Sequence, residues 1–172
     1  MRIIAGSRRG HRIEAPKGLA TRPTSDRVRE NAFNLIGPLE GADVLDLFAG
    51  SGAMGLEALS RGAASAVFVE ANRDACRAIN ANLYKLRLEA TVLCQDVLRA
   101  LAAENRAYDL VLCDPPYDYD RGADLAPHLE RVLAPAGLLV YESGARDEPE
   151  APGLRVRTSR KYGSARLTLF ER

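Results

Sequence analysis

The chain has 172 residues, 47% of them hydrophobic and 27% charged, which is typical of one soluble domain with a buried core. No apolar run approaches the about 20 residues that cross a membrane. The first residues also lack the apolar segment and cleavage site of a secretory signal. We therefore expect a cytoplasmic protein with no membrane segment.

Charge is divided along the chain, although the net charge is only +1. Residues 1–40 carry eight Lys/Arg against four Asp/Glu, residues 41–152 carry ten against eighteen, and residues 153–172 carry six against one. Arg makes up 21 of the 24 basic residues. The planar guanidinium suits phosphate and stacks on bases, so two basic ends rich in Arg favour contact with nucleic acid.

The first 40 residues predict a hairpin followed by a helix. Two short strands at 2–5 and 11–14 flank an arginine-bearing loop. After an irregular link, one of residues 24–26 can cap a helix that runs to about Ile36.

Strand and helix patterns then alternate. Buried, β-rich runs predict strands at 44–49, 66–70, 91–94, 108–113 and 138–142. Helices are expected between them at 53–60, 73–87, 97–104 and 123–133. This alternation implies an α/β fold with a doubly wound, mostly parallel sheet that carries helices on both faces. Strands at 154–159 and 165–170 then predict a C-terminal antiparallel hairpin.

A glycine-rich loop joins the first strand of this series to its helix. Its sequence, Gly50-Ser51-Gly52-Ala53-Met54-Gly55, fits the pattern G-x-G-x-x-G. Glycines let the backbone approach a ligand closely, and a helix N-terminus favours negative charge. The pattern alone also fits a tight turn between a strand and a helix, so it does not distinguish a ligand-binding loop from a purely structural turn.

Three acids beside the loop strengthen the case for a cofactor. Asp46 lies within the first strand, Glu70 ends the second, and Asp96 follows the third. Carboxyl ends of parallel strands share one edge, where Glu70 can accept hydrogen bonds from ribose hydroxyls and Asp96 can reach an adenine edge. Asp46 attracts the cations of S-adenosylmethionine and repels the pyrophosphate of a nicotinamide dinucleotide, so S-adenosylmethionine is favoured.

A rigid polar corner, Asp114-Pro115-Pro116-Tyr117, follows the fourth strand. Proline fixes φ and removes a backbone donor, which leaves carbonyls free to act as acceptors. A carboxylate and a carbonyl can hold a planar amino group, and Tyr117 can stack on the ring that carries it. These four residues alone fit equally well a strand that ends in a Pro-Pro turn.

Together these motifs resemble a known group of enzymes. The segment Asp46-Leu47-Phe48-Ala49-Gly50-Ser51-Gly52 resembles the first motif of class I S-adenosylmethionine-dependent methyltransferases, and residues 111–117 resemble the motif of amino-group methyltransferases. The N-terminal segments 2–6, 9–10 and 22–34 are similar to the RsmD family, the guanine-N2 methyltransferases of bacterial small-subunit (16S) ribosomal RNA.

The resemblance implies a cofactor, a substrate and their residues. The catalytic residues would be Asp114, Pro115, Pro116 and Tyr117. S-adenosylmethionine would be held by Asp46, Phe48, Ala49, Gly50, Ser51, Gly52, Gly55, Glu70, Ala71, Asp96 and Val97, with Asn34 near its methionine end. RNA phosphates would be bound by Arg2, Arg8, Arg9, Arg12 and Arg22.

We expect one domain over residues 1–172, with residues 1–23 as a basic, RNA-contacting extension and residues 24–172 as the catalytic core. The expected partner is 16S ribosomal RNA, either naked or in a partly assembled small subunit, and the enzyme is expected to be a monomer. No metal site is expected. Three alternatives remain: an adenine-N6 methyltransferase of DNA or RNA, a non-catalytic RNA-binding module and a nicotinamide oxidoreductase.

Overall fold

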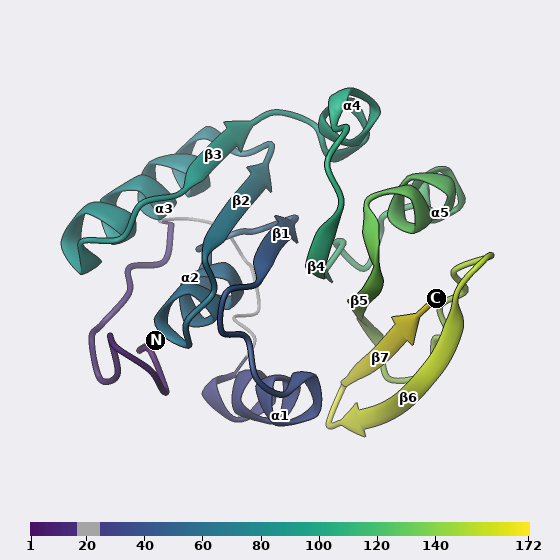
Figure 1. The fold of residues 1–172 in the computed structure, drawn as a ribbon, viewed down its shortest axis with the longest axis horizontal. Helices are drawn as coiled ribbons and strands as arrows, with labels where there is room; N and C mark the ends of the chain where they lie inside the picture. Colours follow the sequence, from purple (N-terminus) through teal and green to yellow (C-terminus); the bar gives the residue numbers. More distant parts are fainter. Residues whose placement is uncertain (17–24) are drawn as a thin grey trace.

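The computed structural model describes residues 1–16 and 25–172, which form a seven-stranded sheet flanked by helices (Figure 1). Its strands are β1 (Asp43–Leu47), β2 (Ser65–Glu70), β3 (Thr91–Cys94), β4 (Tyr108–Cys113), β5 (Leu133–Gly144), β6 (Arg155–Tyr162) and β7 (Ala165–Glu171). Its helices are α1 (Asp26–Ile36), α2 (Ala53–Ser60), α3 (Arg73–Leu86), α4 (Val97–Ala103) and α5 (Gly122–Arg131).

The strand order is β3-β2-β1-β4-β5-β7-β6. Strands β1 to β5 are parallel to one another, and β7 is antiparallel to both β5 and β6. Successive strands move outward from β1 on one side, through β2 and β3, and then restart at β4 on the other. In such sheets the crevice at the carboxyl ends of the strands, beside this reversal, is the usual ligand site.

Helices cover both faces of the sheet. Helices α1, α2 and α3 lie on one side, and α4 and α5 lie on the other (Figure 1). Buried residues accordingly form two clusters, because side chains alternate along each strand. In β1, Val44 joins the cluster under α1 to α3, whereas Leu45 and Leu47 join the cluster under α4 and α5. The predicted doubly wound sheet is confirmed.

Most predicted elements agree with the structure within one or two residues, but two regions differ. Strand β5 begins at Leu133, five residues earlier than expected, because Leu133 already pairs with Tyr108 before an irregularity in the register. The C-terminal hairpin turns at residues 163–164, so Lys161 and Tyr162 belong to β6 and not to the turn.

The predicted N-terminal hairpin is present, but within the described residues its two strands are reduced to an isolated bridge between Arg2 and Arg12. Ile3 N donates to His11 O at 2.9 Å and Ile13 N donates to Met1 O at 3.1 Å across this bridge. The pairing does not continue past Ile3, because the next amides find a competing acceptor. The backbone amides of Ile4 and Ala5 donate to the carboxylate of Glu57 on α2, at 2.8 and 3.0 Å, and not to a partner strand.

Glu57 joins three segments that are distant in sequence. Its carboxylate is fully buried and also accepts from Arg61 Nε at 2.8 Å. Arg29 of α1 is fully buried as well, with its Nε 3.6 Å from Glu57 Oε2. The Arg29 guanidinium donates in addition to the backbone carbonyl of Arg2 and to Asp26. Buried charges are stable only when they are paired in this way, so the cluster fixes the N-terminal segment on α1 and α2.

We predict that Glu57→Ala lowers the free energy of unfolding by roughly 3–5 kcal/mol, because it removes the buried counter-charge of Arg29 and leaves only Asp26, whose side chain is half exposed. The N-terminal segment would also lose its anchor, so amide hydrogen exchange at residues 4 and 5 should accelerate. Urea unfolding and hydrogen exchange measure the two effects. The exposed Glu150 offers a control, and Glu150→Ala should change stability by less than about 0.5 kcal/mol. Equal effects of the two substitutions would contradict the role of Glu57.

Candidate active site

Side chains from four separate segments meet where the parallel strands end. Leu47 of β1 pairs with Val69 of β2 and with Cys113 of β4, so the residues that follow these three lie side by side. We call this end of the sheet, marked by Phe48, Glu70 and Asp114, the carboxyl edge. The glycine loop and the Asp-Pro-Pro-Tyr corner thus lie at one edge, as the sequence predicted.

The glycine loop is held from inside the sheet. Asp46 is buried, and its Oδ2 accepts a hydrogen bond from the Gly55 amide at 2.9 Å. A Cβ on Gly55 would lie 2.3 Å from Phe68 Cε1, so close packing requires this glycine. Gly50 and Gly52 have φ angles of 54° and 77°, which glycine adopts without strain. Apart from Gly50 and its two chain neighbours, no described residue has an atom within 4 Å of the position of a Cβ on Gly50, so this side of the loop has room for a ligand.

Phe48, the residue after β1, has left-handed backbone at φ 58°. For a residue with a Cβ this conformation costs roughly 1–2 kcal/mol. The ring packs edge-on against Tyr119, with the centroids 5.0 Å apart, which helps to hold the strained turn. Such strain often accumulates at ligand sites, where the surrounding structure maintains it.

Glu70 is oriented by two backbone amides. Its Oε2 accepts from Gly50 N and its Oε1 from Asn72 N, both at 2.8 Å. Each carboxylate oxygen can accept a further hydrogen bond, so the side chain is positioned before any ligand binds. Ala71 follows at the exposed rim.

Asp96 caps α4, since its side chain accepts from the Arg99 amide at 3.1 Å. It is exposed at the end of β3, and Val97 behind it is buried in the core. Capping accounts for one carboxylate oxygen and leaves the other available.

Asn82 is a residue of the site that the sequence reading missed. It is fully buried on α3, and its Nδ2 donates to the carbonyl of Ser51 in the glycine loop at 3.3 Å. The same side chain exchanges hydrogen bonds with the backbone of Glu14, at 2.8 and 2.9 Å. The sequence does contain a signal for this role, because Asn82 is a polar residue on the apolar stripe of a helix, next to Leu83 and three residues after Ile79.

Burial raises the pKa of Asp46 from 3.8 to about 7. The Gly55 amide opposes this rise by stabilising the carboxylate, whereas the nearby charge of Glu70 adds to it. Near neutral pH this buried acid is therefore present in both its protonated and its ionised form, and a bound cation would favour the ionised form.

The polar corner stands at the end of β4. The pKa of Asp114 is raised well above its ordinary value by desolvation and by the charges of Glu142 and Asp46. Because the residue as a whole is exposed, water limits this rise until a substrate covers the carboxyl group. Within the described part of the chain, no residue donates a hydrogen bond to the Pro115 carbonyl. Pro116 accepts from the Tyr119 amide at 2.9 Å, and Tyr117 is 65% exposed.

The N-terminal arginines do not lie at the carboxyl edge. Ser7 N donates to Ser60 O at 2.7 Å and Arg8 N to Ser60 Oγ at 2.9 Å, at the last residue of α2. Since α2 starts at the glycine loop and has eight residues, the N-terminal loop lies about 12 Å away, toward the opposite edge of the sheet. The side chain of Arg8 also caps α3, donating to Leu86 O at 2.5 Å and to Arg87 O at 3.3 Å.

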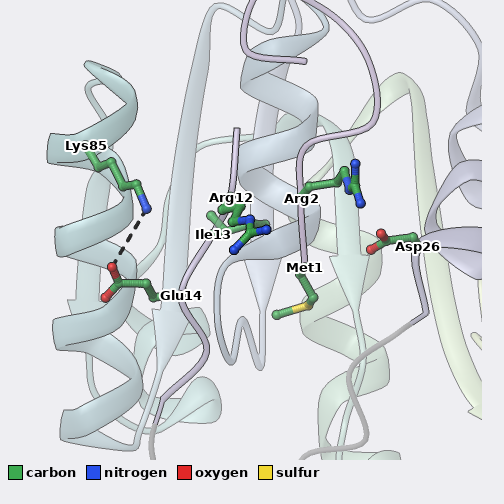
Figure 2. A pocket seen from close by; sticks show the side chains of 7 residues that line it. All are labelled: Met1, Arg2, Arg12, Ile13, Glu14, Asp26 and Lys85. Atoms are coloured by element: carbon green, nitrogen blue, oxygen red, sulfur yellow. Dashed lines mark ion pairs between the residues drawn. The ribbon is translucent and has the colours of Figure 1, made fainter. Parts of the chain in front are cut away.

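Three of the other predicted RNA contacts, Arg2, Arg9 and Arg12, are exposed. Arg2 and Arg12 line a hollow of about 470 Å³ between the N-terminal segment, α1 and α3 (Figure 2). Arg9 lies in the exposed loop, and Arg22 falls outside the described residues. Figure 2 shows that none of the residues predicted to hold the cofactor lines this hollow. Asn34 is exposed on α1.

Within residues 1–16 and 25–172, no helix is long and apolar enough to cross a membrane. The same residues contain no group of three or more His, Cys, Asp or Glu side chains arranged to hold a metal ion.

Comparison with known proteins identifies the family of this chain. A family model described as Conserved hypothetical protein 95 matches residues 1–171. The Bacillus subtilis protein YlbH is 37% identical over 182 residues, covering 100% of this chain and 99% of YlbH. Ribosomal RNA small subunit methyltransferase D of Escherichia coli K12 is 42% identical over 119 residues, covering 68% of this chain and 60% of that protein. The structure of Escherichia coli yhhF gives a TM-score of 0.90 at 36% identity, covering 100% of this chain and 97% of yhhF.

The strand order, the glycine loop and the carboxylates at the carboxyl edge define the class I, S-adenosylmethionine-dependent methyltransferase fold. Within that class, the chain belongs to the Conserved hypothetical protein 95 family, the RsmD family of ribosomal RNA methyltransferases. The membership predicted from the N-terminal segments is confirmed.

We predict that Asp46→Asn removes part of the pH dependence of folding. In the wild type the folded state holds the Asp46 proton up to a pKa of about 7, against 3.8 for a free Asp. This contribution to stability is complete below pH about 4 and is lost as the pH rises to about 7, because the unfolded chain ionises first. Between pH 5 and 8 the wild type should lose on the order of 2 kcal/mol more than the variant, measured by urea unfolding. Parallel pH profiles would show that Asp46 does not titrate in this range.

Proposed function

We propose that this protein transfers a methyl group from S-adenosylmethionine to the exocyclic N2 amine of one guanine in bacterial 16S ribosomal RNA. The observation that carries the proposal is the position of Asp114 and the Pro115 carbonyl at the same sheet edge as the glycine loop. An amine held by these two acceptors would lie beside a ligand of the loop.

The residues at the carboxyl edge suit this cofactor. When bound, S-adenosylmethionine supplies a methyl group on a positively charged sulfur. Asp46 would lie near its cationic methionine part, and its raised pKa would fall as the cations approach. Glu70, already fixed by two amides, would accept from the ribose hydroxyls. The free oxygen of Asp96 would face the adenine, while a pyrophosphate in place of the cations would be repelled by Asp46.

The polar corner would prepare the nitrogen to react. The lone pair of an exocyclic guanine amine is delocalised into the ring, so the amine is a weak nucleophile. Hydrogen bonds from both amine protons to Asp114 and the Pro115 carbonyl would turn the lone pair out of the ring plane. The Asp114 carboxylate would also stabilise the positive charge that develops on nitrogen as the N–C bond forms and the C–S bond breaks. The methylated amine would then lose one proton, to Asp114 or to water, and S-adenosylhomocysteine would be left.

The target base must leave its stack to reach this corner. Tyr117 is 65% exposed and offers a face on which the flipped base can stack. Pro115 and Pro116 fix the backbone, so the acceptors need not reorganise when the base arrives. These residues would act mainly by positioning.

Phosphates of the RNA would be held at a distance from the reacting base. Arg2, Arg9 and Arg12 are exposed and suited to this role, and Arg22 remains a candidate. We assign Arg8 to the C-terminus of α3 instead, because its guanidinium already donates to two carbonyls there. The substrate would be 16S ribosomal RNA, alone or in a partly assembled small subunit.

An adenine-N6 methyltransferase remains the alternative, because the same corner could hold the N6 amine of adenine. Guanine is favoured by the family alone, since Asp114 and its neighbours do not read the rest of the base. Nucleoside mass spectrometry of small-subunit RNA after reaction distinguishes the two, because it separates N2-methylguanosine from N6-methyladenosine. The same reaction run on naked RNA and on small subunits from a strain lacking the enzyme would identify the true substrate.

We predict that Asp114→Ala and Asp114→Asn each lower kcat by about 10²–10³-fold, because charge on the amine is then unopposed. Binding of S-adenosylhomocysteine, measured by calorimetry, should stay within about threefold, since Asp114 holds the base. Activity of the wild type should also fall as the pH drops through the raised pKa of Asp114, because only the ionised carboxylate stabilises that charge. Asp118→Asn, an exposed change in the same loop, serves as the control. Full activity in both Asp114 variants would exclude the proposed role.

A further inference from the structure

The C-terminal hairpin brings its turn to the carboxyl edge. Ala165, the first residue of β7, pairs with Tyr162 on one side and with Gly144, the last residue of β5, on the other. Tyr141 of the same β5 pairs with Cys113, the residue before Asp114. The last residues of β6 therefore lie at the same edge as Asp114, unlike the N-terminal loop.

Strand β6 is strongly basic and forms the outer strand of the sheet (Figure 1). Its eight residues include Arg155, Arg157, Arg160 and Lys161 and contain no acid. Arg155 is paired with Glu171 at 3.0 Å. The other three cations are exposed, and none of them has an ion pair with any residue in the described part of the chain. We call Arg157, Arg160 and Lys161 the β6 cations.

The strand register places one of these cations in line with the polar corner. Arg160 pairs with Leu167, and Leu167 pairs with Glu142. Asp114 follows Cys113, so it stands beside Glu142. Side chains in one cross-strand row share a face of the sheet, so Arg160 and Asp114 are about 14 Å apart on one face. Successive phosphates of one strand of a B-form helix are displaced by about 3.4 Å along the helix axis, so a distance of about 14 Å corresponds to only a few nucleotides.

Charges also serve to protect an outer strand from pairing with other chains. Cations at any position along the strand would fulfil that role. It does not explain why two of the three unpaired ones fall at the turn end, beside the carboxyl edge. Arg166, which pairs with Lys161 across the hairpin, is buried and donates to Ser159 Oγ and to the Ala145 carbonyl, so it is not counted with the exposed cations.

We propose that the β6 cations bind phosphates of the RNA strand within a few nucleotides of the target base. The inference rests on the proposed function and adds a second RNA-binding surface to it, on the opposite side of the polar corner from the glycine loop. The N-terminal arginines would then hold a more distant part of the same RNA.

The test compares two double variants of equal charge. Arg160→Gln/Lys161→Gln removes two β6 cations, and Arg73→Gln/Arg77→Gln removes two exposed cations from α3, beside β3 at the far end of the sheet. The probes are small-subunit ribosomal RNA and small subunits from a strain lacking the enzyme. Their affinities are measured over a range of KCl concentrations, with KM for RNA, kcat and S-adenosylhomocysteine binding measured alongside.

The β6 double variant should bind RNA about tenfold more weakly near 100 mM salt, and its slope of log affinity against log salt should fall by about 1.4. KM for RNA should rise, while kcat and S-adenosylhomocysteine binding stay within about twofold. The α3 double variant should resemble the wild type.

Three results would overturn the proposal. The first is equal RNA affinity in the β6 variant and the wild type, which leaves the proposed function intact. The second is self-association of the β6 variant with unchanged RNA affinity in its monomer, which would assign the cations to protection of the strand. The third is an equal loss in both double variants, which would indicate a general effect of charge. A wild type that binds and methylates no RNA would instead refute the proposed function itself.

Discussion

The turn between β1 and α2 is held by two carboxylates that come from the sheet, and the shape of the crevice depends on them. Asp46 fixes the Gly55 end of the turn and Glu70 fixes the Gly50 end. The loop is therefore organised without a ligand. This arrangement has an electrostatic cost, because a buried acid beside a second acid ionises reluctantly. A cation in the crevice would offset that cost, so the groups that build the loop would also select the charge of its ligand.

Helix α2 has only eight residues, yet it connects most of the functional parts. Its first turn forms the glycine loop, its middle carries Glu57, and its last residue, Ser60, receives the N-terminal loop. The extension proposed to contact RNA and the crevice proposed to hold the cofactor are thus attached to the same short helix.

The alternation of strands and helices and the meeting of Asp46, Glu70 and Asp114 at one edge could be predicted, because both follow from local patterns and from the rule for parallel strands. The early end of the N-terminal pairing could not, since the amides of Ile4 and Ala5 bind a carboxylate more than fifty residues away. The roles of Arg8 and Gly55 could not be predicted either, because each depends on a contact with a residue distant in the sequence. Arg8 has the sequence context of an RNA contact but caps a helix, and Gly55 fits a ligand motif but is required by the Phe68 ring.

The separation of the N-terminal loop from the carboxyl edge has a consequence for how a base would be chosen. The polar corner can grip an amine but cannot read the bases around it. An RNA bound by both the N-terminal arginines and the hairpin would have to present phosphates at both places at once. It would therefore be recognised by its folded shape. The enzyme would then recognise one base by its position in a three-dimensional RNA, and short oligonucleotides with the same local sequence would be poor substrates.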